Sequence, residues 1–96
     1  MLNAPFEWDE AKNQANMQKH GVSFNEAITV FDDDYALYQP DPDHSQHEER
    51  FMILGYSSAL RLLLVCHCYR KSDAVIRIIS ARKATKFETN QYGGTP

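Results

Sequence analysis

Three runs of strand-forming residues dominate the stretch RFMILGYSSALRLLLVCHCYRKSDAVIRIISA, residues 50–81. The runs cover residues 50–56, 61–69 and 74–81, and the segments SSAL and RKSD between them are short enough for hairpin turns. The second and third runs are almost continuously apolar, a pattern typical of central strands that are covered on both faces. This stretch therefore predicts an antiparallel meander at the centre of the fold.

Two helices are predicted before the meander. Asp9 is placed to cap a helix that ends near His20, and Gly21 follows where a left-handed C-terminal residue is common. Ser23 and Glu26 have the spacing of a capping box for a second helix. Because the apolar residues of that second helix recur on one face, we expect it to be the better buried of the two.

The two ends of the chain complete the predicted architecture. Thr85 and Glu88 form another capping box, which starts a last helix. Short strands are predicted at residues 6–8 and 35–39. We therefore expect a single α+β domain over residues 1–96, with two N-terminal helices, an antiparallel sheet of about four strands and a C-terminal helix.

The composition is that of a small globular domain. With 96 residues, of which 43% are hydrophobic, the chain has enough apolar side chains for one modest core. It has no apolar run long enough to span a membrane and no pattern of a secretory signal, so we expect a cytoplasmic protein without a membrane partner. Cys66 and Cys68 are two residues apart on a predicted strand, a poor geometry for a disulfide, and reduced thiols are expected.

Charge is divided unevenly along the chain. Residues 1–49 contain eleven acidic residues against two lysines, whereas residues 50–96 contain eight basic residues against two acidic ones. This division is typical of a chain whose C-terminal half faces a polyanion. The alternative is a surface on which the two signs intermix after folding, because halves of a sequence are not faces of a fold. Composition leaves both interpretations open.

One arginine lies inside the third apolar run. In a regular strand Arg77 shares a face with Val75 and Ile79, and burying its charge without an acceptor is unfavourable. One interpretation is a salt bridge to an acid such as Glu48 or Glu49. The other is that the strand presents Arg77 on an open face, where its fork of donors binds phosphate.

More positive charge directly follows that strand. Arg82 and Lys83 come just before the helix start near Thr85, and the free backbone N–H groups of a helix start attract anions. Together with Arg77, these side chains predict a phosphate-binding site. As separate surface charges they carry no functional meaning.

A second candidate cluster lies in the loop HSQHEER, before the first long strand. It offers His44, His47, Glu48, Glu49 and Arg50, and a histidine beside a carboxylate is a common arrangement for proton transfer. The alternatives are a solvated loop and a metal site at the two histidines, for which no second pair of ligands with recognisable spacing exists elsewhere in the sequence.

The other two histidines have simpler interpretations. His67 lies in the apolar second run, where a hydrogen-bonded interior residue is expected. His20, beside Lys19 at a helix C-terminus, complements the helix dipole. The sequence contains no Gly-rich phosphate loop, serine elbow or triad spacing, which disfavours nucleoside triphosphate and acyl-transfer chemistry.

The segments FEWDEAKNQANMQKHGVSFNEA, VFDDD, HSQHEER and IRIISARKATKFE, in this order, resemble the BrnT family, the toxin half of a bacterial type II toxin–antitoxin pair. The resemblance extends from Phe6 to Tyr92. It implies a RelE-like ribonuclease fold, RNA cleavage that inhibits translation and growth, and neutralisation by a BrnA antitoxin with a ribbon-helix-helix DNA-binding part. It also implies that the toxin–antitoxin complex represses its own operon, so that operator DNA is contacted only through that complex.

The resemblance also implies a set of site residues. Taken with the chemistry above, it predicts an endoribonuclease that needs no metal or cofactor, in which the ribose 2′-OH attacks the adjacent phosphate. The cations that stabilise the phosphate are expected to be Arg50, Arg77, Arg82 and Lys83. Glu48 or His44 is the candidate general base, and His20 is a weaker candidate for the acid.

The predicted RNA-binding surface has three members, which are Lys19, His20 and Lys86. The competing hypothesis is a binding module, in which the same basic face only holds an antitoxin segment or nucleic acid, without turnover. Expression without the antitoxin separates the two hypotheses, because only a nuclease stops growth with loss of RNA.

Overall fold

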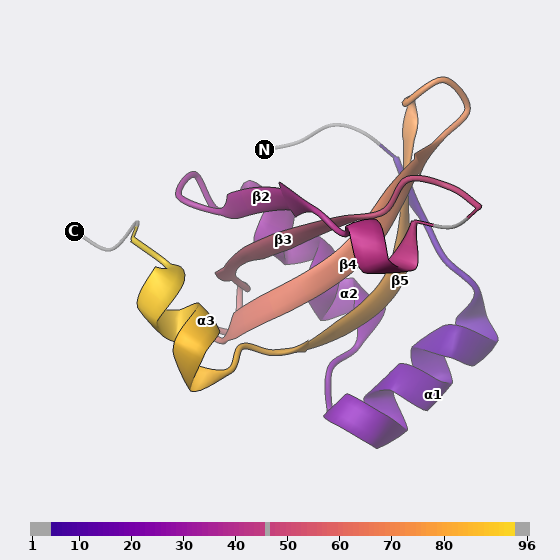
Figure 1. The fold of residues 1–96 in the computed structure, drawn as a ribbon. Coiled ribbons are helices and arrows are strands. Elements are labelled where there is room, and N and C mark those ends of the chain that lie inside the picture. The colour runs from indigo at the N-terminus through magenta and orange to yellow at the C-terminus, as the bar shows by residue number, and fades with distance from the viewer. Residues whose placement is uncertain (1–4, 46, 94–96) are drawn as a thin grey trace.

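Figure 1 shows the computed structural model of the chain, which describes residues 5–45 and 47–93, without the side chain of His44. A five-stranded sheet forms its centre, in the order β1-β5-β4-β3-β2. The strands are β1 (Phe6–Glu7), β2 (Leu37–Pro40), β3 (Phe51–Tyr56), β4 (Leu62–Arg70) and β5 (Val75–Lys83). The helices are α1 (Glu10–His20), α2 (Phe24–Ala27), α3 (Lys86–Gln91) and the 3-10 helices η1 (Ile28–Asp32) and η2 (Pro42–His44).

The predicted antiparallel meander is confirmed: β3 pairs with β4, and β4 pairs with β5. β2 adds an antiparallel edge beside β3. β1 lies parallel to β5, with Phe6 opposite Ile76 and Glu7 opposite Arg77. The sheet is therefore mostly antiparallel and has five strands where about four were expected, because both short strands, predicted at residues 6–8 and 35–39, join it as edge strands.

The predicted helix caps are present, with one difference. Asp9 accepts hydrogen bonds from the first turn of α1, and Gly21 adopts the left-handed conformation with φ 69°. Both bonds of the Thr85 capping box are formed at the start of α3. The side chain of Ser23 caps α2, so half of the predicted capping box is present. The carboxylate of Glu26 does not close the box, because it binds Arg61 and Ser57 instead of the Ser23 backbone.

The second predicted helix is shorter than expected. α2 ends at Ala27, and the chain continues as the 3-10 helix η1. Residues 28–30 are all β-branched, which lowers their preference for the α-helix. The tighter η1 still turns Val30 and Phe31 toward the sheet, where both are buried, so the predicted apolar face is kept.

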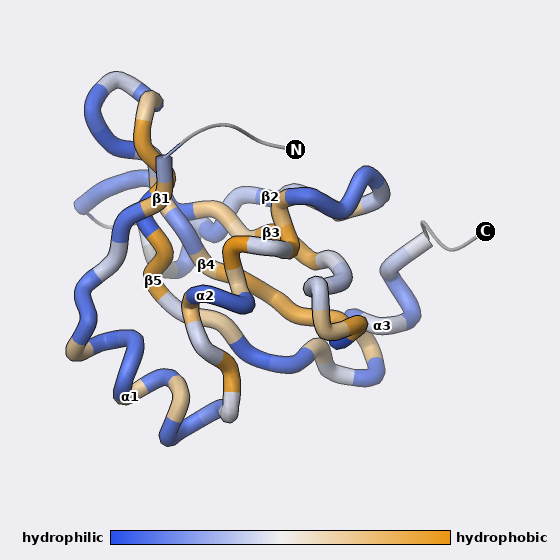
Figure 2. Tube along the Cα trace, turned by 180° about the vertical axis from the view of Figure 1, so that it is seen from behind, coloured by the Kyte–Doolittle hydropathy of each residue, from blue (hydrophilic) through white to orange (hydrophobic). Residues whose placement is uncertain are grey.

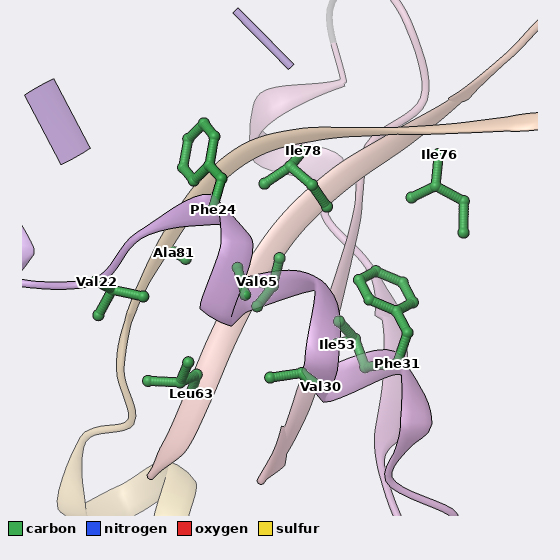
Figure 3. Close-up of a cluster of buried hydrophobic side chains, with 11 residues drawn as sticks. Val22, Phe24, Val30, Phe31, Ile53, Leu63, Val65, Ile76, Ile78 and Ala81 are labelled. Atoms are coloured by element: carbon green, nitrogen blue, oxygen red, sulfur yellow. The ribbon is translucent and has the colours of Figure 1, made fainter. Parts of the chain in front are cut away.

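The main hydrophobic core lies between α2–η1 and one face of the sheet. Figure 3 shows its side chains converging from the segment around α2 and η1 and from the central strands. Its members are Val22, Phe24, Ala27, Val30, Phe31, Ile53, Leu63, Val65, Ile76, Ile78 and Ala81. Figure 2 shows the same division along the chain, with hydrophobic residues along the central strands and a largely hydrophilic α1.

The opposite face of the sheet is covered only in part. A small second cluster joins Leu54, Leu64 and Tyr92 where the chain around α3 crosses β3 and β4. The Tyr92 hydroxyl donates a 2.6 Å hydrogen bond to Asp33, which fastens the end of α3 to the loop after η1. We call the remainder of this face, beyond α3, the open face.

A β-bulge in β5 decides which side chains reach the open face. Ser80 pairs with Cys66 and Ile78 with His67, so Ile79 is an extra residue between two regular pairs. Beyond the bulge the alternation of β5 is shifted by one residue. Arg77 therefore shares its face with Ser80 and Arg82 rather than with Ile79, as expected from regular alternation.

The free edge of β5 is closed by a side chain of α1. β1 pairs only with the start of β5, and further along the strand Asn16 takes the place of a neighbouring backbone. Its amide donates to the Ala81 carbonyl at 2.8 Å and accepts from the Ala81 N–H at 3.1 Å. These bonds fix α1 along the edge of the sheet.

The predictions for His67 and the cysteines are confirmed. His67 has no exposed surface and packs its ring 4.9 Å from that of Phe31. Desolvation lowers its pKa to about 4, so the ring is neutral at physiological pH. Cys66 and Cys68 are free thiols, both on the face opposite the main core.

Candidate functional site

The open face contains a pocket in which two of the predicted arginines meet. Its volume is about 200 Å³, and we call it the arginine pocket. Its walls are formed by Asp41, Arg50, Met52, Leu64, Cys66, Ile79, Ser80 and Arg82. The bulge places Ser80 and Arg82 here, on the same face as the residue that precedes β3.

Arg50 is the arginine of this pocket with the most unused hydrogen-bonding capacity. Its Nε is buried and has no hydrogen-bond partner among the described residues. The backbone is fixed on both sides, since its N–H donates to Ser45 Oγ at 2.9 Å and its carbonyl accepts from the Asp41 N–H at 2.8 Å. The backbone of Arg50 is thus fixed at the wall of the pocket, where its guanidinium can bind an oxygen of a ligand.

Arg82 also lines the pocket and is held by α3. Its guanidinium donates to both carboxylate oxygens of Glu88, at 2.8 and 2.9 Å. The same carboxylate belongs to the Thr85 capping box, so the helix start and the arginine are positioned together. The side chain of Arg82 remains 38% exposed. The hydrogen bonds from Arg82 are the main reason that the pKa of Glu88 is lowered, which keeps this carboxylate charged.

Arg77 is paired with an acid that was not expected. Its Nη1 donates to Glu7 on β1 at 2.9 Å, whereas the salt-bridge interpretation had named Glu48 or Glu49 as examples of the acid. The parallel register places Glu7 directly opposite Arg77. Arg70 lies 4.0 Å from the same carboxylate. Arg77 therefore lies on the open face but outside the lining of the arginine pocket.

Glu48 lies on the open face among positive charges. A hydrogen bond from the Cys68 thiol, opposed by desolvation, lowers the pKa of the Glu48 carboxyl. Three arginines lower it further, namely Arg50, Arg70 and Arg77. Burial, and then the hydrogen bond to Glu48, raise the pKa of Cys68 to about 11. The structure thus holds an ionised carboxylate beside a protonated thiol and close to Arg50.

Lys19 and His20 belong to a neighbouring hollow of about 210 Å³. This α1 hollow is lined by Lys12, Ala15, Asn16, Lys19, His20, Ile79 and Ser80. Ile79 and Ser80 also line the arginine pocket, so the two hollows meet at the bulge. The end of α1 and the arginines are thereby brought to one continuous surface.

Two predicted residues, Lys83 and Lys86, line neither of these hollows. Lys83 pairs with Leu63, a residue of the main core, and its charge lowers the pKa of Glu26 on α2. Lys86 is exposed at the first turn of α3. His44 is in η2, and its side chain lies outside what the structure describes.

Glu49 lines a third hollow rather than the arginine pocket. This aromatic hollow has a volume of about 470 Å³ and is lined by Glu48, Glu49, Phe51, Tyr69 and Asp73. Among residues 5–45 and 47–93, no three His, Cys, Asp or Glu side chains are grouped so that they could hold a metal ion.

Sequence reasoning missed Lys12 and Ser80. Lys12 precedes Lys19 by seven residues, which is two helical turns, so one face of α1 carries both lysines. That spacing is visible in the sequence. Ser80 had no comparable signal, because its position depends on the bulge.

The whole fold is similar to that of a small bacterial toxin nuclease. The crystal structure of the Brucella abortus ribonuclease toxin, BrnT, matches with a TM-score of 0.67 and 26% sequence identity, over 88% of this chain and 100% of that chain. Residues 8–88 match the family described as "Ribonuclease toxin, BrnT, of type II toxin-antitoxin system". The chain belongs to this BrnT family of type II toxins, and membership implies an antitoxin partner.

Two further comparisons concern the chain as a whole. No curated protein gives a significant match to the sequence. In the described part of the chain, every helix is too short or too polar to cross a membrane.

Proposed function

We propose that this protein is a metal-independent endoribonuclease that cleaves RNA over the arginine pocket. The observation that carries the proposal is the arginine pocket of about 200 Å³, which both Arg50 and Arg82 line. The family is named for ribonuclease toxins, which agrees with this chemistry. No cofactor is needed.

In this proposal Glu48 is the general base. It takes the proton of a ribose 2′-OH as the 2′ oxygen attacks the adjacent phosphorus, while Arg50 and Arg82 stabilise the charge that gathers on the phosphoryl oxygens. The bond from phosphorus to the 5′ oxygen breaks, and that oxygen receives a proton from His20. The products are a 2′,3′-cyclic phosphate and a free 5′-OH. His44 remains the alternative base.

The RNA strand is proposed to follow the surface on which the two hollows meet. Lys12 and Lys19 line the α1 hollow and would bind phosphates on one side of the cleaved bond. Lys86 lies at the start of α3, on the other flank of the sheet (Figure 1). A strand running from α1 to α3 crosses the arginine pocket.

The biological role follows from the family resemblance. The toxin acts in the cytoplasm, where RNA cleavage inhibits translation and growth. A BrnA-like antitoxin with a ribbon-helix-helix part neutralises it, and the complex of the two represses their operon through contacts that the antitoxin makes with DNA.

The direct test is cleavage of single-stranded RNA by the purified chain in the presence of a chelator. Replacement of Arg50 by Ala should lower the cleavage rate by about 100- to 1,000-fold, the usual loss for one charge-stabilising donor. Lys71→Gln, in the exposed β4–β5 turn, removes one positive charge elsewhere and serves as the matched control. Full activity of Arg50→Ala, or products without 2′,3′-cyclic phosphate or 3′-phosphate ends, would refute the proposal.

One observation favours the competing hypothesis of a binding module. Arg77 is paired with Glu7 and Arg82 with Glu88, so two of the predicted cations already have partners within the chain. Expression without the antitoxin decides between the two functions. Unchanged growth and intact RNA, together with a stable antitoxin complex, would establish the module.

A further inference from the structure

The two margins of the sheet differ in how they are closed. At the β5 margin, β1 and the side chain of Asn16 bind the strand. At the other margin, β2 is the last strand in the order β1-β5-β4-β3-β2, and all four of its residues are exposed. Figures 1 and 2 both show β2 along this margin. Within the described residues, β2 is therefore the open edge of the sheet.

The pairing with β3 decides which backbone groups of β2 point outward. Asp41, just after β2, lies opposite Arg50 and donates its N–H to the Arg50 carbonyl at 2.8 Å. Hydrogen-bonded and non-hydrogen-bonded pairs alternate along an antiparallel ladder. Counting back from Asp41, Pro40 and Tyr38 turn their backbone groups away from β3. Because proline has no N–H, the donor that β2 presents at its outer edge is the Tyr38 N–H.

The side chains of β2 leave room for an added segment. Leu37 is 40% exposed, and Tyr38, on the other face of the strand, is 57% exposed. Leu37 borders a hollow of about 320 Å³ on the open face, which we call the edge hollow. It is lined by Leu37, Gln39, Leu54 and Gln91. A strand added beside β2 directs alternate side chains to the two faces, so that one apolar residue reaches the edge hollow and the next contacts Tyr38.

The charge around β2 has a single sign. Residues 32–43 contain five aspartates and no basic residue. Of these, Asp34 and Asp43 are exposed at the two ends of the strand. Two copies of the chain paired antiparallel about Tyr38 would bring Asp34 of one copy close to Asp43 of the other, and like charges oppose that pairing. The edge therefore suits a partner segment that carries lysine or arginine.

We propose that β2 is the docking edge for the antitoxin, which adds an extended segment to the sheet beside it. The segment accepts a hydrogen bond from the Tyr38 N–H and places an apolar side chain in the edge hollow. Its basic side chains pair with Asp34 and Asp43. Family membership implies the partner, and its place on the sheet is the new inference. The inference does not depend on RNA cleavage, because its tests measure binding.

The experiment is amide hydrogen exchange, followed by NMR, on the full chain alone and in complex with the antitoxin encoded beside it. The Tyr38 amide should exchange rapidly in the free chain, since it points away from β3. In the complex its exchange should slow by at least about 10-fold, because an N–H bonded within a sheet exchanges only when the sheet opens. The Gln39 amide points toward β3 and serves as the internal control, slower than Tyr38 in the free chain.

Two matched pairs of variants assign the binding to β2. Tyr38→Pro removes the outward N–H and Tyr38→Ala keeps it, so antitoxin affinity should be about 10-fold or more lower in the proline variant. The sheet keeps its own hydrogen bonds, because a proline is tolerated where the N–H side of an edge strand faces solvent. Leu37→Asp places a charge in the edge hollow and should weaken binding by at least about 10-fold. Leu60→Asp makes the same change at an 82% exposed position in the β3–β4 turn and should leave the affinity unchanged.

Each outcome decides for or against the docking edge. Circular dichroism checks that the variants fold, and the exchange measurement on the unchanged chain needs no variant. Absence of a complex, unprotected Tyr38 in the complex, or equal affinities of Tyr38→Pro and Tyr38→Ala would overturn the inference. A dimer of the chain alone that is lost in Tyr38→Pro would assign the edge to a second copy and overturn it as well. Protection of Tyr38 in a chain that does not cleave RNA would refute the proposed nuclease and support the docking edge.

Discussion

The two faces of the central sheet differ in what covers them. The face under α2 and η1 carries a continuous apolar core, whose side chains are almost all fully buried. The open face has a small apolar cluster under α3, and beyond it come the arginine pocket and Glu48. One face therefore supplies most of the stability, while the other is free to carry charge at fixed positions.

The bulge at Ile79 allows one strand to serve both faces. Ile78 and Ala81 both point into the main core, although they are three positions apart, a spacing that places residues on opposite faces of a regular strand. Arg77 and Arg82 consequently share the opposite face. The comparison of the two faces thus depends on a single extra residue in β5.

The largest effect is expected from deletions that test this register. Deleting Leu64 from the middle of β4 should abolish cooperative folding, because a one-residue slip turns half of the strand to the wrong face. Deleting Ile79 removes only the extra residue and keeps every other pair, so the protein should fold with a loss of about 1–3 kcal/mol. Urea titrations followed by circular dichroism measure both, and equal behaviour of the two deletions would contradict the assignment of the bulge.

The next prediction compares two phenylalanines on the two sides of the molecule. Phe24 is fully buried in the main core, so Phe24→Ala should lower the free energy of unfolding by about 3–5 kcal/mol. Phe87, on α3, is 71% exposed, and the same change there should stay within about 0.5 kcal/mol. Urea unfolding of both variants tests the contrast. A large loss from Phe87→Ala would mean that α3 buries more surface than the structure shows.

A smaller effect is expected from acid acting on the main core. The pKa of His67 falls from 6.5 in the unfolded chain to about 4 in the fold, because burial opposes the charged ring. The unfolded chain binds more protons in this interval, so stability falls as the pH is lowered from 6.5 toward 4. Between pH 6.5 and 5 the loss should be about 2 kcal/mol.

His67→Gln is the variant that tests this origin. It should lower stability at every pH, but the slope between pH 6.5 and 5 should largely disappear. Carboxylates with lowered pKa values, such as Glu88, act at more acidic pH and do not contribute in this window. An unchanged slope in His67→Gln would assign the acid sensitivity to another group.

The features that could be predicted from the sequence are those with local causes. The meander follows from alternating and apolar runs separated by short turns, and the caps at Asp9 and Thr85 need only residues within one helical turn. Arg50 and Glu48 were named as site candidates from the loop before the first long strand and from the family resemblance, and Arg50 lines the arginine pocket. Their position depends little on how the distant parts of the chain pair.

The features that could not be predicted depend on distant pairing. The partner of Arg77 is Glu7, 70 residues away in the chain. The parallel register between β1 and β5 sets this pair, and a two-residue strand gives no sequence signal of its register. Lys83 was grouped with Arg82 by adjacency, although neighbours in a strand point to opposite faces. The bulge exists only through the pairing of β5 with β4, so regular alternation wrongly assigned Ile79, though not Val75, to the face of Arg77.

The smallest effect is expected from two ion pairs that lie on the two sides of the sheet. Glu88→Gln breaks the pair with Arg82 on the open face, while Gln can still close the capping box, so the loss of stability should be about 0.5–1 kcal/mol. The folded pKa of Glu88 is lowered, so the pair stabilises the protein above the unfolded pKa of a glutamate, and this contribution is lost as the pH falls through the folded value. The control is Glu26→Gln, which breaks the matched pair between Glu26 on α2 and Arg61.

The two variants should differ in RNA binding. Only Glu88→Gln releases an arginine into the arginine pocket, so it should strengthen binding of single-stranded RNA several-fold. Glu26→Gln should lower stability without this gain. Equal RNA affinities in the two variants would mean that Arg82 is a structural residue and that Arg50 alone defines the pocket.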